Sequence, residues 1–245
     1  MEMITQIAIS GILSIALSIV AYRLRMLTFT GALASLLVGY TVGLFGSIEW
    51  LILLVVFTSA GLAVTKLYLS DKSELGLQEG NFGERTHSNV LGVGIPACAF
   101  AVAYGVLHTM LNGKYDLALT VAFISTLTVA AADTVASELG MRDRKVWLIT
   151  TFERVRRGTN GGVSVLGIVS SAAASAFTGA VGYLLILKGI DVYVLVPIAM
   201  GVLGSTVDSL LGATLEERGT ISKYTNNCVS GFIGGILGLL IVLFL

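Results

Sequence analysis

Two short polar strings of nearly the same sequence stand in the second half of this chain. Residues 159–164 read Thr-Asn-Gly-Gly-Val-Ser, and residues 225–230 read Thr-Asn-Asn-Cys-Val-Ser. Each string begins a hydrophobic segment, and each follows an acidic residue inside the preceding hydrophobic segment, Asp133 or Asp208. The pattern indicates a helix-loop-helix unit that is used twice, and we expect the function to reside there.

The residue types in these strings are suited to binding anions. A helix N-terminus presents unpaired backbone amides and a partial positive charge, and glycine lets a phosphate approach the backbone closely. The alternative is ordinary helix capping, because Thr and Asn are both good N-caps. The repetition beside a basic loop favours phosphate binding over capping alone. The candidate residues are Thr159, Asn160, Gly161, Gly162 and Ser164 in the first string, and Asn226 and Asn227 in the second.

Basic residues lie next to these strings. Arg156 and Arg157 come directly before the first string, and arginine forks bind phosphate oxygens bidentately. The alternative is a cluster that sets membrane topology or contacts anionic lipids. A looser third string, residues 85–92, begins another hydrophobic segment with Arg85. Lys66, Lys72 and Arg85 are further candidates for nucleotide contact.

Three carboxylates are embedded in apolar segments, where a charge is costly and usually serves an ion, a proton or a substrate. Asp133 and Asp208 are expected at similar depths in neighbouring helices, where they would suit a magnesium ion that also contacts substrate phosphates. Glu138 lies on a different face of the helix from Asp133 and is a candidate for organising the metal site. The alternative for all three is pairing with a basic residue for bundle specificity.

The elements that position these residues must be membrane-spanning helices. Hydrophobic residues make up 55% of the 245 residues and charged residues only 12%, which is far from the composition of soluble domains. A span needs about 20 apolar residues, and strands of a barrel would alternate polar and apolar residues. We therefore predict an all-α, polytopic transmembrane bundle that forms one domain, 1–245. The eight predicted spans are 3–21, 27–45, 48–69, 88–110, 117–140, 161–187, 192–213 and 227–245.

The basic residues are distributed unevenly between the connections. The connections after odd-numbered spans are rich in Lys and Arg, whereas the opposite connections hold only Lys114 and Lys188. By the positive-inside rule the side rich in Lys and Arg is cytoplasmic, so both termini are predicted on the outer side of the cell membrane. The polar strings then surround one cytoplasmic mouth. Glycine pairs such as Gly231 with Gly235 indicate close helix packing.

The chain lacks the Walker-type Gly-Lys-Ser/Thr string, paired-His zinc spacing and the nucleophile elbow. It resembles the integral-membrane phytyl-phosphate kinase family, whose relatives include membrane proteins with a domain of unknown function. The resemblance covers nearly the whole chain and rests on Arg23-x-Arg25-x-Leu27-Thr28, on Lys66 with its downstream acidic loop, and on residues 132–140, 158–164 and 208–213.

The resemblance implies transfer of a phosphoryl group from a nucleoside triphosphate, with CTP as the expected donor, to an isoprenoid monophosphate in the membrane. It also implies kinship with membrane prenol kinases and lipid cytidylyltransferases, and no nucleic-acid partner. A CTP-dependent lipid cytidylyltransferase would use almost the same residues. A secondary transporter would also use intramembrane carboxylates, but with a central site and gates to both faces.

Overall fold

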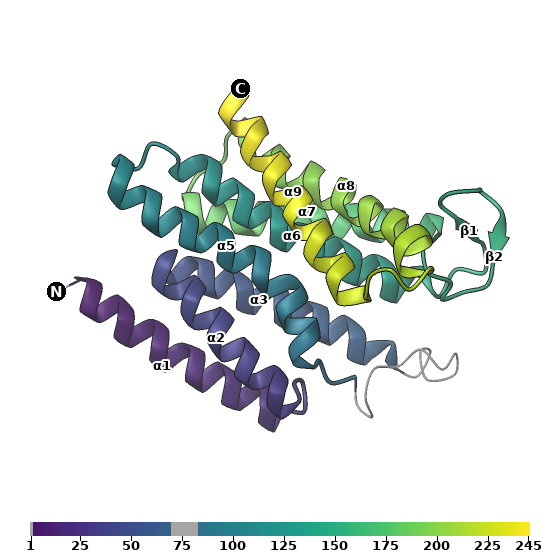
Figure 1. Ribbon diagram of the computed structural model, residues 1–245, viewed down its shortest axis with the longest axis horizontal. Helices are drawn as coiled ribbons and strands as arrows, with labels where there is room; N and C mark the ends of the chain where they lie inside the picture. The colour runs from purple at the N-terminus through teal and green to yellow at the C-terminus, as the bar shows by residue number, and fades with distance from the viewer. Residues whose placement is uncertain (1, 70–82) are drawn as a thin grey trace.

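A computed structural model describes residues 2–69 and 83–245, which form a bundle of α-helices (Figure 1). Seven helices in this part of the chain are long and apolar enough to cross a membrane, while α2 has 17 residues. The predicted all-α polytopic fold is confirmed. The helices are α1 (Glu2–Arg23), α2 (Phe29–Phe45), α3 (Ile48–Leu67), α5 (His87–Leu111), α6 (Asp116–Gly140), α7 (Val165–Leu187), α8 (Leu195–Leu211) and α9 (Lys223–Phe244).

The connection between α6 and α7 folds into a small sheet that the sequence analysis did not predict. Its strands are β1 (Val146–Leu148), β2 (Arg154–Val155) and β3 (Gly162–Val163), in the antiparallel order β2-β1-β3. Trp147 pairs with Arg154 on one side and with Val163 on the other. We call residues 146–163 the ribbon; it projects from one end of the bundle (Figure 1).

Helix α6 lies at the centre of the bundle. In the apolar stretch of α6, 78% of the residues are buried inside the protein, whereas the share is 17% to 39% in the apolar stretches of the other six long helices. Its neighbours include α5, α7, α8 and α9 (Figure 1). An acidic residue on α6 is therefore surrounded by protein instead of lipid, which is the usual setting of a functional intramembrane carboxylate.

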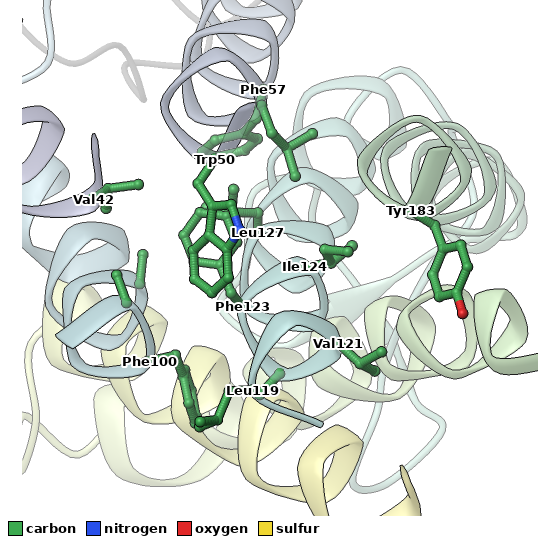
Figure 2. Packing of buried hydrophobic residues seen from close by; sticks show 14 of the residues in the cluster. Val42, Trp50, Phe57, Phe100, Leu119, Val121, Phe123, Ile124, Leu127 and Tyr183 are labelled. Atoms are coloured by element: carbon green, nitrogen blue, oxygen red, sulfur yellow. The ribbon is translucent and has the colours of Figure 1, made fainter. Parts of the chain in front are cut away.

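Buried hydrophobic side chains pack around α6 in the core (Figure 2). Glycines let the neighbouring helices approach α6 closely. The ring of Trp50 on α3 stacks on Phe123 of α6, with ring centroids 4.1 Å apart. A Cβ added at Gly204 of α8 or Gly234 of α9 would lie 2.3 or 2.5 Å from Val129 Cγ2 of α6. Glycine therefore lets α8 and α9 pack directly on α6, and Gly231 and Gly235 on α9 pack closely in the same way, as predicted.

The polar connections meet at the ribbon end of the bundle. Lys66 Nζ at the end of α3 donates to Leu24 O, 3.1 Å away, just after α1. Leu27 bridges to Arg85 before α5. The N-terminus lies at the opposite end, where Lys188 pairs with Glu49 at 3.5 Å (Figure 1). The structure thus brings the predicted basic connections to one end, whereas the assignment of that end to the cytoplasm stays a prediction.

Candidate functional site

Two acidic side chains from different helices meet near the ribbon end of the bundle. The carboxyl groups of Asp133 on α6 and Asp208 on α8 are in hydrogen-bonding contact, and both residues are half-buried. Gly204 of α8 packs closely on Val129 of α6 about one turn along both helices from this contact, which sets the two helices in register. Two carboxylates that touch repel each other unless a proton or cation lies between them. The pair is therefore suited to holding a cation.

Helix α9 holds Asp208 in place with amide and hydroxyl groups. Ser230 Oγ donates to Asp208 Oδ1 over 3.2 Å, and Asn226 Nδ2 donates to Asp208 O over 3.0 Å. When the amide of Asn227 is oriented so that its nitrogen faces the neighbouring acceptors, Asn227 Nδ2 also donates to Asp208 Oδ1 over 3.2 Å. Asn226 is 1% exposed, so this support is part of the packed interior.

The end of α8 widens into a π-helical turn over Gly212–Glu216. Such turns change the direction in which side chains point and are frequent at functional sites. Here Glu216 Oε2 accepts a hydrogen bond from Asn226 Nδ2 over 3.2 Å, and its charge acts on both Asp133 and Asp208. The turn therefore adds a third carboxylate to the neighbourhood of the pair.

The acidic pair lines a cavity of about 430 Å³ between α6, α7, α8 and the ribbon. This size is typical of small-molecule sites. The wall combines apolar residues with hydroxyls, glycines and one lysine. It includes Asp133, Ser137, Ile149, Phe152, Gly158, Thr159, Asn160, Gly161, Gly162, Ser164, Ile168, Ser171, Val202, Ser205, Thr206, Asp208, Glu216, Lys223 and Asn226.

The first polar string lines this cavity, but it does not begin a helix. Gly161 has φ +71° in a turn, Gly162 lies in β3, and α7 begins only after Ser164. Ser164 is the N-cap: its Oγ accepts from Gly167 N over 3.1 Å. The predicted N-cap role of Thr159 or Asn160, and the predicted span start at 161, are therefore wrong. The two glycines end the ribbon before the helix can start.

The second string has a different backbone conformation. Helix α9 begins at Lys223 with Ser222 as its N-cap, so Thr225, Asn226 and Asn227 lie inside the helix. The alternative interpretation, capping by Thr225 or Asn226, and the predicted span start at 227 are both wrong, because Ser222 caps the helix and α9 has already begun at Lys223. The two strings are therefore not copies of one structural unit, although both approach Asp208 or the cavity beside it. The third string does begin a helix, as the sequence indicated, and Thr86 is the N-cap of α5.

Among the described residues, Lys223 and Arg85 are two cations whose charges reach the acidic pair. The charges of both act on Asp133, and Lys223 also lines the cavity. The backbone N–H of Arg85 donates a hydrogen bond to Met26 O over 3.0 Å. This bond ties the start of α5 to the α1–α2 connection. A cation beside the carboxylates and facing the cavity is in a position to contact a phosphate group.

Of the other predicted cations, Arg156, Arg157 and Lys66 do not line the cavity. Arg156 and Arg157 are exposed in the turn after β2 and do not line the cavity, although they come directly before residues that do. Lys66 is bound to Leu24 O at the α1–α2 connection. Lys72 lies outside the described residues. Phosphate contact by these four residues stays a prediction.

Glu138 is not brought together with the acidic pair. It is 3% exposed, and its Oε1 accepts a hydrogen bond from Thr65 Oγ1 of α3 over 2.9 Å. This agrees with the expectation that Asp133 and Glu138 point to different faces of α6. Glu138 links α6 to α3, and its role in organising a metal site stays a prediction.

Several polar residues at the cavity were not selected from the sequence, among them Ser171, Ser205, Glu216 and Lys223. A signal for Lys223 exists, since it stands two residues before Thr225-Asn226, as Arg157 stands two residues before Thr159-Asn160. The serines gave no signal, because a serine in an apolar helix can face any neighbour. Glu216 reaches the pair only through the π turn, which the sequence does not indicate.

Comparison with known proteins gives a consistent family relationship. The model of a family described as integral membrane protein DUF92 matches residues 12–236. An uncharacterized membrane protein of Methanocaldococcus jannaschii is 31% identical over 98% of this chain and 96% of its own length. Two Arabidopsis thaliana proteins are also similar: Protein PGR, 30% identical over 86% of this chain and 79% of its own, and chloroplastic Protein VTE6, 28% identical over 89% and 64%. No solved structure matches the chain.

Proposed function

Since this chain belongs to the DUF92 family of integral membrane proteins, we propose that it is a membrane kinase that phosphorylates an isoprenoid monophosphate with a nucleoside triphosphate. The contact between Asp133 and Asp208 at a cavity near one end of the bundle carries this proposal. Of the two proposed substrates, the nucleotide is water-soluble and the isoprenoid monophosphate is anchored in the bilayer. A cavity at the polar end of the bundle suits both. The sequence resemblance to phytyl-phosphate kinases supports the same reaction, with CTP as the expected donor.

In the proposed reaction an oxygen of the acceptor phosphate attacks the γ-phosphorus of the nucleotide. The bond from that phosphorus to the bridging oxygen breaks, so the products are a nucleoside diphosphate and an isoprenoid diphosphate. Phosphoryl transfer depends mainly on alignment and on neutralising charge. The acceptor is already an ionised phosphate monoester, so the protein needs no strong general base.

The acidic pair fits a divalent cation such as Mg²⁺. Within residues 2–69 and 83–245, no group of three or more His, Cys, Asp or Glu side chains could enclose a metal ion alone. Mg²⁺ in phosphoryl-transfer enzymes is commonly held by one or two carboxylates together with water and substrate phosphates. Asp133 and Asp208 would hold it here, and a bound Mg²⁺ would neutralise charge on the polyphosphate.

The remaining groups of the cavity have roles that follow from their chemistry. Lys223 offers a positive charge to the nucleotide phosphates beside Asp133. At Gly158, Gly161 and Gly162 the ribbon offers backbone groups without side chains that would block a close approach. Asn226 and Ser230 fix the position of Asp208 through the hydrogen bonds described above. The kinase therefore needs no soluble nucleotide-binding domain.

Product analysis tests the proposal. Purified protein in detergent, given CTP, Mg²⁺ and phytyl or geranylgeranyl monophosphate, is expected to form the isoprenoid diphosphate and CDP, and EDTA is expected to stop the reaction. Mass spectrometry distinguishes the alternatives. A cytidylylated lipid with released diphosphate would make the protein a cytidylyltransferase. No nucleotide-dependent product with any of these acceptors would contradict the kinase and favour a secondary transporter.

Lys223→Gln is expected to raise the KM for the nucleotide about tenfold, because a charged hydrogen bond to phosphate is lost. The KM for the lipid acceptor should change much less. Lys188→Gln is the matched control, since Lys188 pairs with Glu49 at the opposite end of the bundle. Steady-state kinetics with each substrate varied in turn measure both constants. Equal effects of the two variants would remove Lys223 from the nucleotide site.

A further inference from the structure

Helices α7 and α8 pack closely away from the ribbon and separate toward it. A Cβ added at Gly201 would lie 2.4 Å from Ser175 Oγ, and one at Gly179 would lie 2.8 Å from Ile198 Cγ1. Nearer the ribbon, residues of both helices line the cavity instead, including Ile168 on α7 and Val202 and Thr206 on α8.

The residues on both sides of this gap also face the outside of the bundle. Ile168 is 56% exposed, and Thr206 is exposed while its hydroxyl donates to Val202 O over 2.8 Å. Leu203, beside them on α8, is 51% exposed. These side chains present apolar surface at a depth where the surroundings are lipid. Residues of α7 and α8 that border the cavity are therefore accessible on this side, in addition to its polar side at the ribbon.

A buried hydroxyl lies on the wall of the cavity, on α7. Ser171 is 4% exposed, lines the cavity, and its Oγ has no hydrogen-bond partner among the described residues. A buried hydroxyl without a partner costs about 1–3 kcal/mol, and this one is available to form a hydrogen bond with a ligand in the cavity.

The packing of α6 against α7 places this hydroxyl near the acids. Ala136 O lies 3.3 Å from the position of a Cβ on Gly167, in an antiparallel pair of helices. Moving about one turn along each helix from this contact pairs Asp133 with Ser171. Both residues line the same cavity. A group bound by Ser171 is thus next to the carboxylates.

We propose that the lipid acceptor enters sideways from the bilayer between α7 and α8, and that Ser171 Oγ donates a hydrogen bond to its phosphate beside Asp133. The isoprenoid chain leaves between these helices past Ile168, while the nucleotide occupies the ribbon side of the cavity near Lys223. This inference rests on the proposed kinase function and assigns separate entrances to the two substrates. It identifies Ser171 as an acceptor-binding residue.

A second apolar cavity, of about 340 Å³, defines the competing location. It lies between α3, α6 and α7 and is lined by residues such as Phe57, Val135, Ala174 and Phe177. These residues lie on the faces of α6 and α7 that point away from the acidic pair. A chain bound there could not bring its phosphate to Asp133 without passing through the α6–α7 contact.

Photo-crosslinking tests the location without requiring turnover. The probe is geranylgeranyl monophosphate with a diazirine on the isoprene unit next to the phosphate, added to the full chain in detergent without nucleotide. Labelled peptides are expected from the parts of α7 and α8 around Ile168 and Leu203, and unlabelled geranylgeranyl monophosphate should compete. Labelling confined to α3 and the Phe177 region of α7 would overturn the lateral entrance, even if the protein proves to be a kinase. Absence of any competed label would overturn it as well.

Ser171→Ala tests the binding role. The KM for geranylgeranyl monophosphate is expected to rise at least about tenfold, with the KM for CTP unchanged, and Ser171→Thr should restore most of the loss because it keeps the hydroxyl. Ser170→Ala is the matched control, since Ser170 is 6% exposed on the same helix but lines the second cavity. An equal rise in both alanine variants, or no rise in Ser171→Ala, would remove Ser171 from the site. An inactive wild-type protein that still gives the expected labelling would reject the kinase function but keep the lipid entrance.

Discussion

Asp133→Asn is expected to lower kcat/KM for phosphoryl transfer by at least about a thousandfold, which corresponds to about 4 kcal/mol of transition-state stabilisation. Asn has nearly the shape of Asp but no negative charge, so the contact with Asp208 remains while the pair loses half of its charge toward a cation. The polyphosphate would then lack the neutralisation on which phosphoryl transfer depends. Initial rates of isoprenoid diphosphate formation measure the effect.

The same substitution should leave the fold intact. Removing one of two touching carboxylates relieves repulsion, so the thermal unfolding midpoint in detergent should stay the same or rise. Asp116→Asn is the matched control: it lies at the first turn of the same helix, where Asp116 pairs with His108 at the opposite end of the bundle. It should keep activity. A fully active Asp133→Asn variant would exclude Asp133 from the site, and an unfolded one would give it a structural role.

The sequence predicted the bundle well because lipid imposes strong constraints on composition. Apolar length alone located α3, α5, α6 and α8 to within a few residues, since each must satisfy its backbone hydrogen bonds inside the bilayer. The depths of Asp133 and Asp208 also followed from position along a helix. Their actual contact depended on Gly201 and Gly204, which let α8 approach α6 closely. That pairing of helices cannot be read from one sequence.

The ribbon and its neighbours were not predictable for local reasons. Strands of two or three residues carry too little alternation to be recognised, and Thr159-Asn160 looks the same before a turn as at a helix N-terminus. Gly161 and Gly162 indicate a turn in place of a helix N-terminus only when the surface against which they pack is known. Ser171 gave no signal, because its importance comes from lacking a hydrogen-bond partner on the cavity wall.

The contact between the ribbon and α8 is a second point at which a small change should have a large effect. Gly161 has φ +71°, and a Cβ added there would lie 2.3 Å from Ala213 Cβ and 2.7 Å from Ala213 N, inside the π turn. Neither of these atoms can move without moving the backbone. The ribbon is thus held directly against the turn that carries Glu216, and this contact sets one wall of the cavity.

Gly161→Ala is therefore expected to lower kcat/KM about a hundredfold, because displacement of a substrate-positioning wall by about 1 Å has effects of that size. Alanine at positive φ also costs about 1–2 kcal/mol, so a control must carry the same backbone strain. Gly219→Ala provides it: Gly219 has φ +69° in the α8–α9 connection, with nothing within 4 Å of an added Cβ. The two variants should lose similar thermal stability, whereas only Gly161→Ala should lose activity. Equal activities would mean that the ribbon does not need to touch the π turn for catalysis, and that the site lies on the helices alone.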